Sequence, residues 1–168
     1  NYIALRDTLR AEGRVFATES DTEVIAHLVA RSYGGDMREA VVDALRQVKG
    51  AFSLVGLTRE FMFALRDPHG VRPLVIGHLN GARVVASESS SFVLIGGTVE
   101  RELDPGEMLI VHADGTEELI KPFLPTTPKP CVFELVYFAR PDSTVFGRHV
   151  YETRKRMGEI IASESAVE

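Results

Sequence analysis

The sequence has 168 residues, of which 19 are Lys or Arg and 24 are Asp or Glu, so the formal net charge is −5. This length suits one domain with an appendage, because two full domains would need a longer chain. An acidic balance without a long basic run argues against nucleic-acid binding, and no apolar run is long enough to span a membrane. The only cysteine, Cys131, excludes an internal disulfide and fits a reducing compartment, so we expect a cytoplasmic protein.

Three helices are predicted in the first fifty residues, with one short strand from Arg14 to Thr18. The helical patterns cover Tyr2 to Glu12, Ser20 to Gly34 and Met37 to Lys49. The second and third helices carry apolar stripes in succession and should cover a flat surface. The chain opens with Asn1 at the edge of a helical pattern and without an initiator methionine, from which we expect a fragment.

The second predicted helix begins with Ser20-Asp21-Thr22-Glu23. In this spacing the Ser20 side chain accepts from the amide of the third helical residue, while the Glu23 carboxylate reaches back to the amide of Ser20. The Asp21 side chain takes no part in these two predicted hydrogen bonds. The helix dipole favours its carboxylate, which should stay ionised and ready to meet an ammonium group. A good first-turn residue without a ligand explains Asp21 as well, and this window alone leaves both interpretations open.

From residue 51 the pattern changes to short β-type runs separated by turns, which predicts an antiparallel meander. The clearest signal is Asn80-Gly81, a two-residue turn between the runs Leu74 to Leu79 and Arg83 to Ala86. Further runs are predicted at residues 51–57, 61–65, 107–111 and 117–121, with a short helix within 87–97.

Four prolines between residues 122 and 130 indicate a stiff, extended connector and a domain edge. Beyond it the composition changes. An aromatic and branched run from Val132 to Ala139 ends at Arg140-Pro141-Asp142-Ser143, and a basic helix is predicted from His149 to Ala162.

Several of these motifs together resemble the glutaminase domain of class II glutamine amidotransferases, the group of N-terminal-nucleophile hydrolases. The window Ser20 to Ile25 is shared widely in that group, including by glucosamine-6-phosphate synthases. Other motifs are similar to the glutamine phosphoribosylpyrophosphate amidotransferases in particular: Ala64 to Leu74, Ala86 to Ser89, Cys131 to Glu134 and Val136 to Ser143. The last motif disfavours the glucosamine-6-phosphate synthase branch.

The resemblance implies an α+β fold, a four-layer α/β/β/α sandwich with antiparallel sheets, truncated at its N-terminus. Residues 1–139 would then be part of the glutaminase domain, and residues 140–168 the junction and first helix of a phosphoribosyltransferase domain. It further implies an enzyme that converts phosphoribosyl diphosphate and glutamine to phosphoribosylamine, glutamate and diphosphate, the first committed step of purine synthesis. Mg²⁺ is expected for the transferase domain, and members of this family are commonly homo-oligomers.

In this family an N-terminal cysteine attacks the glutamine amide, and an Asn-Gly pair forms the oxyanion hole. Residue 1 is Asn and the only thiol is Cys131, so both pieces are expected upstream of Asn1. Asp21 alone matches a family contact, the aspartate that holds the α-amino group of glutamine. The chain by itself should therefore be inactive as a glutaminase. The alternative is a non-catalytic amidotransferase-like module that binds a small amino acid or regulates a partner.

The other candidate residues have structural explanations. Proline and glycine account for the turn from Asp67 to Pro73, and a helix start accounts for Ser87, Glu88 and Ser89. The five histidines show no metal-ligand spacing, so no metal site is predicted.

Some family members hold an iron–sulfur cluster with one ligand near Cys131, the one candidate ligand here. A cubane cluster takes four thiolates, so we expect a half-buried free thiol. Arg140, Asp142 and Ser143 are expected to make interdomain contacts.

Overall fold

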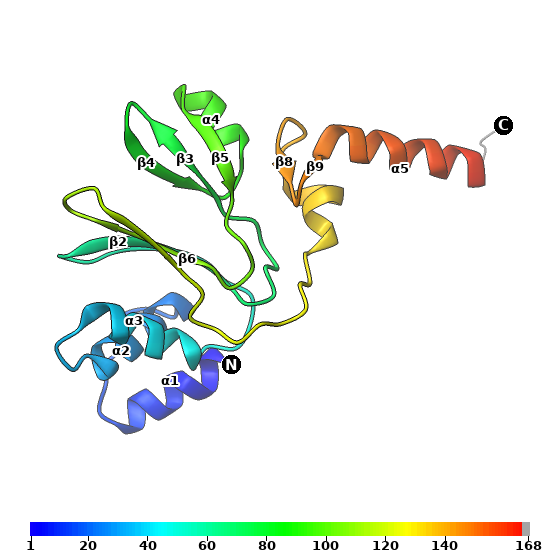
Figure 1. Cartoon of the computed structure of the whole chain (residues 1–168). Helices are drawn as coiled ribbons and strands as arrows, with labels where there is room; N and C mark the ends of the chain where they lie inside the picture. The colour runs from blue at the N-terminus through cyan, green and yellow to red at the C-terminus, as the bar shows by residue number, and fades with distance from the viewer. Residues whose placement is uncertain (166–168) are drawn as a thin grey trace. The chain divides into compact units, whose positions relative to one another are not determined.

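A computed structural model describes residues 1–165 of the chain (Figure 1). The chain divides into two compact units, Asn1–Gly50 and the residues from Ala51 onward. Within residues 1–165 no helix combines the length and the apolar character that crossing a membrane requires. The domain boundary predicted between residues 139 and 140 is a different division, and it stays a prediction.

Three helices build the first unit: α1 (Tyr2–Ala11), α2 (Asp21–Ser32) and α3 (Met37–Arg46). The three predicted helices are confirmed, although α3 ends before the predicted Lys49. Their apolar stripes meet in one small core, whose buried members are Leu9, Val24, Leu28 and Ala44. The first unit therefore has a hydrophobic core of its own.

The segment of residues 14–18 between α1 and α2 is not a strand, contrary to the prediction. Val15 is 85% exposed, so its side chain has no core to pack against. The amides of Ala17 and Thr18 donate to the Glu23 carboxylate at 2.7 and 2.8 Å, and not to a neighbouring strand. A run of branched and aromatic residues forms a strand only where a partner strand and a surface to pack on are at hand.

The second unit contains two larger antiparallel sheets and, near its C-terminal end, a two-stranded one (Figure 1). The first has the order β1-β2-β6-β7, formed by β1 (Ser53–Leu57), β2 (Phe61–Arg66), β6 (Met108–His112) and β7 (Glu117–Ile120). The second has the order β4-β3-β5, formed by β3 (Val75–Leu79), β4 (Ala82–Ala86) and β5 (Thr98–Glu102). The predicted α+β class with antiparallel sheets is confirmed.

The predicted hairpin at Asn80-Gly81 is present, and the runs predicted at residues 51–57 and 61–65 pair as a second hairpin, but the two hairpins belong to different sheets. In the β3–β4 hairpin Leu79 pairs with Ala82, and the turn residues Asn80 and Gly81 have φ of 50° and 84°, as a type I′ turn requires. After β2 the chain crosses to the second sheet, and β6 then returns to pair with β2. The prediction of a single meander is therefore wrong.

The two sheets pack face to face around a core of buried side chains, formed by Ala64, Leu74, Ile76, Leu103 and Leu109. The predicted short helix is confirmed as α4 (Ser90–Ile95), and it covers the other face of β3. There the ring of Phe92 lies over Gly77. A Cβ on Gly77 would come within 2.6 Å of that ring and 2.1 Å of the Thr98 carbonyl oxygen, so this packing requires glycine.

Beyond β7 an extended connector leads to the C-terminal elements. The amides of Lys129 and Cys131 donate to the carbonyl oxygens of His69 and Val71 at 2.8 and 3.0 Å, which fastens the connector to the turn after β2. The elements that follow are a π-helical turn η1 (Glu134–Phe138), β8 (Thr144–Val145), β9 (Arg148–His149) and α5 (Val150–Glu164). Helix α5 confirms the predicted basic helix.

Candidate functional site

The first candidate site is the start of α2, where Asp21 is the first helical residue. Ser20 caps the helix through its side-chain oxygen, but this oxygen accepts from the amide of the second helical residue, Thr22, at 3.2 Å and not from that of the third, as predicted. Asp21 is exposed, and the Thr22 hydroxyl donates to its Oδ1 over a long 3.4 Å. Its carboxylate can therefore accept strong hydrogen bonds from a ligand.

Glu23 does not complete the predicted capping box. Its carboxylate accepts from the amides of Ala17 and Thr18 and from the Thr18 hydroxyl, and not from the amide of Ser20. These hydrogen bonds, above all the one from the Thr18 side chain, lower the pKa of the Glu23 carboxyl to about 2. Residues 14–18 form a loop and not a strand because the Glu23 carboxylate accepts from the amides of Ala17 and Thr18, which a strand would offer to a partner strand.

Arg6 on α1 holds the end of the same loop through contacts with Glu19 and Ser20. Its side chain is buried, and its Nη2 donates to the Ser20 carbonyl oxygen at 2.7 Å while Nη1 pairs with Glu19. The guanidinium carbon lies 4.8 Å from the centre of the Phe16 ring. The residue immediately before Asp21 is thus held by α1, which orients the first turn of α2.

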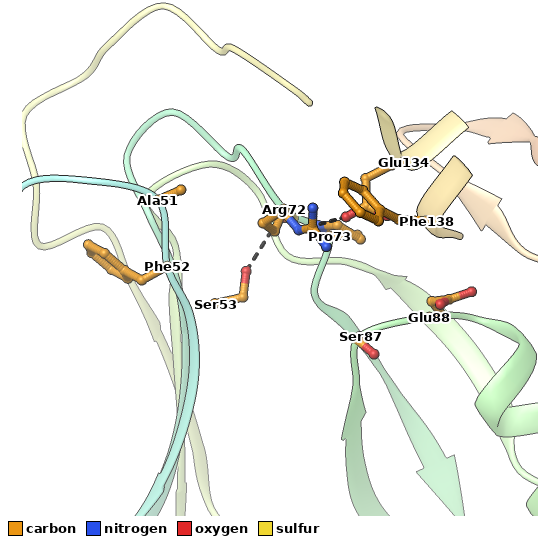
Figure 2. A pocket seen from close by; sticks show the side chains of 9 residues that line it. All are labelled: Ala51, Phe52, Ser53, Arg72, Pro73, Ser87, Glu88, Glu134 and Phe138. Atoms are coloured by element: carbon orange, nitrogen blue, oxygen red, sulfur yellow. Dashed lines mark hydrogen bonds and ion pairs between the residues drawn. The ribbon is translucent and has the colours of Figure 1, made fainter. Parts of the chain in front are cut away.

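The second candidate site is a cavity of about 470 Å³ within the second unit (Figure 2). One wall is the approach to β1, formed by Ala51, Phe52 and Ser53. The other walls come from distant parts of the chain: Arg72 and Pro73 before β3, Ser87 and Glu88 after β4, and Glu134 and Phe138 of η1. Residues from four of the motifs that carry the family resemblance therefore meet around one cavity.

Arg72 is the cation of this cavity. Its Nε lies 2.7 Å from Oε1 of Glu134, and its guanidinium carbon lies 4.5 Å from the centre of the Phe138 ring. Figure 2 shows the three side chains side by side. Glu134 is almost fully buried. Burial raises the pKa of the Glu134 carboxyl, and the nearby Arg72 partly offsets this rise. The sequence analysis missed this pair, although a glutamate within the apolar run from Val132 to Phe138 is a signal for a buried partner.

Arg66, at the end of β2, and Asp67, the first residue of the turn, hold the turn that carries Arg72. Asp67 is fully buried, and its carboxylate accepts from the amides of His69 and Val71 at 2.9 and 3.1 Å. The buried Arg66 donates to the carbonyl oxygens of Arg72 and Gly70 at 2.8 and 3.0 Å. These contacts support the structural interpretation of the turn, with Arg72 as the residue that faces the cavity.

Glu88 joins two motifs that the sequence analysis treated separately. Its Oε2 accepts from the Arg140 amide at 2.7 Å and from the Ser143 hydroxyl at 2.8 Å. The Ser90 hydroxyl lies 2.9 Å from the buried Ser143 hydroxyl and donates to it, because Ser143 gives its one proton to Glu88. The neighbouring Ser89 accepts from the Thr144 amide at 2.8 Å. We call these contacts the Glu88 clasp. They fasten residues 140–144 to the end of β4, a role that a helix start alone does not describe.

The other predicted candidates do not join either site. Cys131 is a half-buried free thiol. Among residues 1–165 there is no group of three or more His, Cys, Asp or Glu side chains that could hold a metal ion. A four-thiolate cluster therefore does not fit the described residues, which offer a single thiol. Arg140 pairs with Asp142 at 3.0 Å on the surface, so their interdomain contacts stay a prediction.

The comparisons with known proteins agree with this architecture. A model of the glutamine amidotransferase domain matches residues 1–93, more than half of the sequence, so the chain belongs to this family. Among its relatives, amidophosphoribosyltransferase 2, chloroplastic, from Arabidopsis thaliana is 48% identical over 170 residues, which cover 100% of this chain and 30% of the relative. The amidophosphoribosyltransferase of Bacillus subtilis is 40% identical over 168 residues, which cover 100% of this chain and 35% of the relative.

Solved structures support the same relationship. The glutamine phosphoribosylpyrophosphate amidotransferase of B. subtilis in complex with ADP and GMP has a TM-score of 0.94 and 40% sequence identity to this chain, covering 100% of it and 37% of that protein. The resemblance found in the motifs is thus confirmed, and so is its fold class. The chain spans about a third of the length of the proteins it matches. Because the plant relatives are named chloroplastic, the expected cytoplasmic location stays a prediction.

Proposed function

We propose that these residues are the amino-group-binding part of a glutaminase domain in an amidophosphoribosyltransferase. The intact protein would convert phosphoribosyl diphosphate and glutamine to phosphoribosylamine, glutamate and diphosphate. The family membership and the two B. subtilis and A. thaliana relatives support this assignment. Transferase residues outside the chain would hold Mg²⁺, and we expect a homo-oligomer.

The observation that carries the proposal is the state of Asp21. Its carboxylate is exposed and is engaged only by the long contact from Thr22, while Ser20 and Glu23 satisfy the surrounding amides. A carboxylate in the first turn of a helix interacts favourably with the helix dipole. An ionised carboxylate on a fixed support binds an ammonium group through charge-assisted hydrogen bonds, as the α-amino group of glutamine requires.

The catalytic groups would come from outside these 168 residues. Amide hydrolysis by acyl transfer needs an activated nucleophile and donors for the developing oxyanion. Residue 1 is Asn, and the single thiol belongs to the half-buried Cys131 in the second unit. We therefore expect residues 1–168 alone to bind glutamine weakly and to leave it unhydrolysed.

The test is Asp21→Ala and Asp21→Asn in the intact protein, assayed with glutamine and with free ammonia. Loss of a charge-assisted contact should raise the KM for glutamine roughly 10- to 100-fold and leave the ammonia-dependent rate unchanged. Asp7→Ala is the matched control, because Asp7 is also an exposed aspartate but lies on α1 and not at the start of α2. Equal losses with both nitrogen donors would show that Asp21 serves the fold only.

A non-catalytic amino-acid-binding module is the second candidate, because the exposed Asp21 carboxylate would serve binding without hydrolysis equally well. It makes a different prediction for the intact protein. Glutamine would bind in an Asp21-dependent manner, yet no glutamate would be released. Glutamate release from the intact protein would rule this module out.

A further inference from the structure

The cavity around Arg72 brings together charged side chains from motifs far apart in the sequence (Figure 2). Arg72 follows β2, Glu88 follows β4, and Glu134 belongs to η1. Burying a carboxylate such as Glu134 against a guanidinium contributes little net stability, because desolvation opposes the attraction. A buried ion pair on the wall of a cavity is therefore a candidate for binding rather than for folding alone.

Arg72 is arranged in advance for an anionic group. Its backbone oxygen accepts from Arg66 Nε and from the Ser53 hydroxyl, which fixes the main chain. Its side chain is fixed by Glu134 at Nε and by the Phe138 ring. Its Nη1 and Nη2 have no hydrogen-bond or ion-pair partner among residues 1–165, and the side chain is 41% exposed. Two free guanidinium nitrogens on a fixed side chain match the geometry of a carboxylate.

The other charges of the cavity limit the class of ligand. One guanidinium faces two carboxyls, Glu88 and Glu134, so the walls do not favour a polyanion such as a nucleotide or a diphosphate. In the Glu88 clasp only Oε2 is used, and Oε1 accepts no hydrogen bond from the part of the chain that the structure describes. Glu88 can therefore accept from a cationic donor, while Arg72 donates to an anionic group.

We propose that this cavity binds a free α-amino acid, with its carboxylate on Arg72, its ammonium group toward Glu88 and its side chain against the Phe138 ring. The volume of about 470 Å³ lies within the range of small-ligand sites. All residues that line the cavity belong to the second unit and Asp21 belongs to the first, so this proposal uses none of the residues of the glutamine contact proposed above. It does not depend on that proposal.

The probe is L-norleucine, whose two matched analogues each lack one charged group. Hexanoate lacks the amine, and pentylamine lacks the carboxylate. Binding is measured by saturation-transfer NMR on the intact protein that carries Asp21→Ala, so that the first site does not contribute. We expect norleucine to bind with a Kd on the order of 1 mM and each analogue to bind at least about tenfold more weakly.

Two substitutions test the assigned contacts. Arg72→Lys keeps the charge and removes the planar fork, and Glu88→Gln keeps the clasp acceptor and removes the charge. Each should weaken norleucine binding at least about tenfold. Arg59→Lys and Glu60→Gln are the controls, since both residues are exposed in the turn between β1 and β2 and lie outside the cavity lining.

Several outcomes would overturn the proposal. Equal binding of norleucine and hexanoate would remove the role of Glu88, and unchanged binding in both cavity variants would place the ligand elsewhere. If Arg72→Lys fails to fold, Glu88→Gln decides the matter alone. Absence of norleucine binding at about 10 mM, well above the expected Kd, would end the proposal. None of these results bears on the glutamine KM of the Asp21 variants, so the two proposals fail separately.

Discussion

The start of α2 and the cavity around Arg72 are held in opposite ways. At the start of α2 the Glu23 carboxylate accepts from near neighbours in sequence, the amides of Ala17 and Thr18, and Arg6 of α1 adds a contact from 14 positions away. In the cavity wall the Glu88 clasp joins residues 52 and 55 positions apart, and its partner Ser143 is fully buried. The exposed hydrogen bonds at the start of α2 orient the first turn, which carries the Asp21 carboxylate. The buried hydrogen bonds of the Glu88 clasp join residues far apart in sequence and fix whole segments of the chain to each other.

This difference predicts that substitutions near the cavity will affect stability most. Arg66→Met should give the largest effect, because Arg66 donates to three carbonyl oxygens, those of Gly70, Arg72 and Leu103. Removing one partner of a buried charged network typically destabilises a protein by about 3–5 kcal/mol. Urea unfolding, followed through amide exchange in β2 and β6, measures the change.

The control for Arg66 is Arg59→Met in the exposed turn between β1 and β2. A surface substitution of this kind usually changes the free energy of unfolding by less than about 0.5 kcal/mol. If the two variants unfold at the same urea concentration, the hydrogen bonds of Arg66 contribute no more to the free energy of unfolding than an exposed side chain does. The contrast between the two regions would then be lost.

The Glu88 clasp should give an intermediate effect. Glu88→Ala leaves the buried Ser143 hydroxyl and the Arg140 amide without their shared acceptor, which should cost about 1–3 kcal/mol. Amide exchange at Arg140 and Thr144 should become faster. Glu88→Gln keeps an oxygen acceptor and should stay close to the wild type. Faster exchange in Glu88→Gln, equal to that in Glu88→Ala, would show that charge and not hydrogen bonding holds residues 140–144.

The sequence predicts most elements where hydrophobic periodicity and caps are strong. The three helices of the first unit and the hairpin at Asn80-Gly81 are such cases. Strand β5 has no comparable signal, because Thr98–Glu102 is polar and mostly exposed and becomes a strand only by pairing with β3. Residues 14–18 show the reverse case. Their composition indicates a strand, but Glu23 takes the amides that a partner strand would need.

The candidate sites divide along the same line. Asp21 can be found from sequence because a helix start is a local pattern, although the spacing assigned Glu23 to the wrong amide. The pair of Arg72 and Glu134 cannot be found in this way, since the two side chains belong to distant motifs that only the tertiary fold brings together. A local pattern can indicate that Glu134 needs a partner, but it does not say which residue supplies one.

The smallest expected effect concerns pH at the start of α2. The Glu23 carboxyl has a pKa of about 2 in the folded chain, compared with 4.5 as its ordinary value. Because the folded value is the lower one, the contribution of Glu23 to stability is complete above pH 4.5 and is lost as the pH falls toward 2. A ¹³C NMR titration of the Glu23 side chain should therefore give a midpoint near 2.

Thr18→Ala sharpens this test, since the Thr18 hydroxyl is the largest cause of the lowered pKa of Glu23. Its removal should raise the midpoint toward 4.5, although the amides of Ala17 and Thr18 keep it below that value. Thr8→Ala is the control, because the Thr8 hydroxyl bonds only within α1. A wild-type midpoint near 4.5 would mean that the loop before α2 is not held by Glu23. In that case the support argued for Asp21 would rest on Arg6 and Ser20 alone.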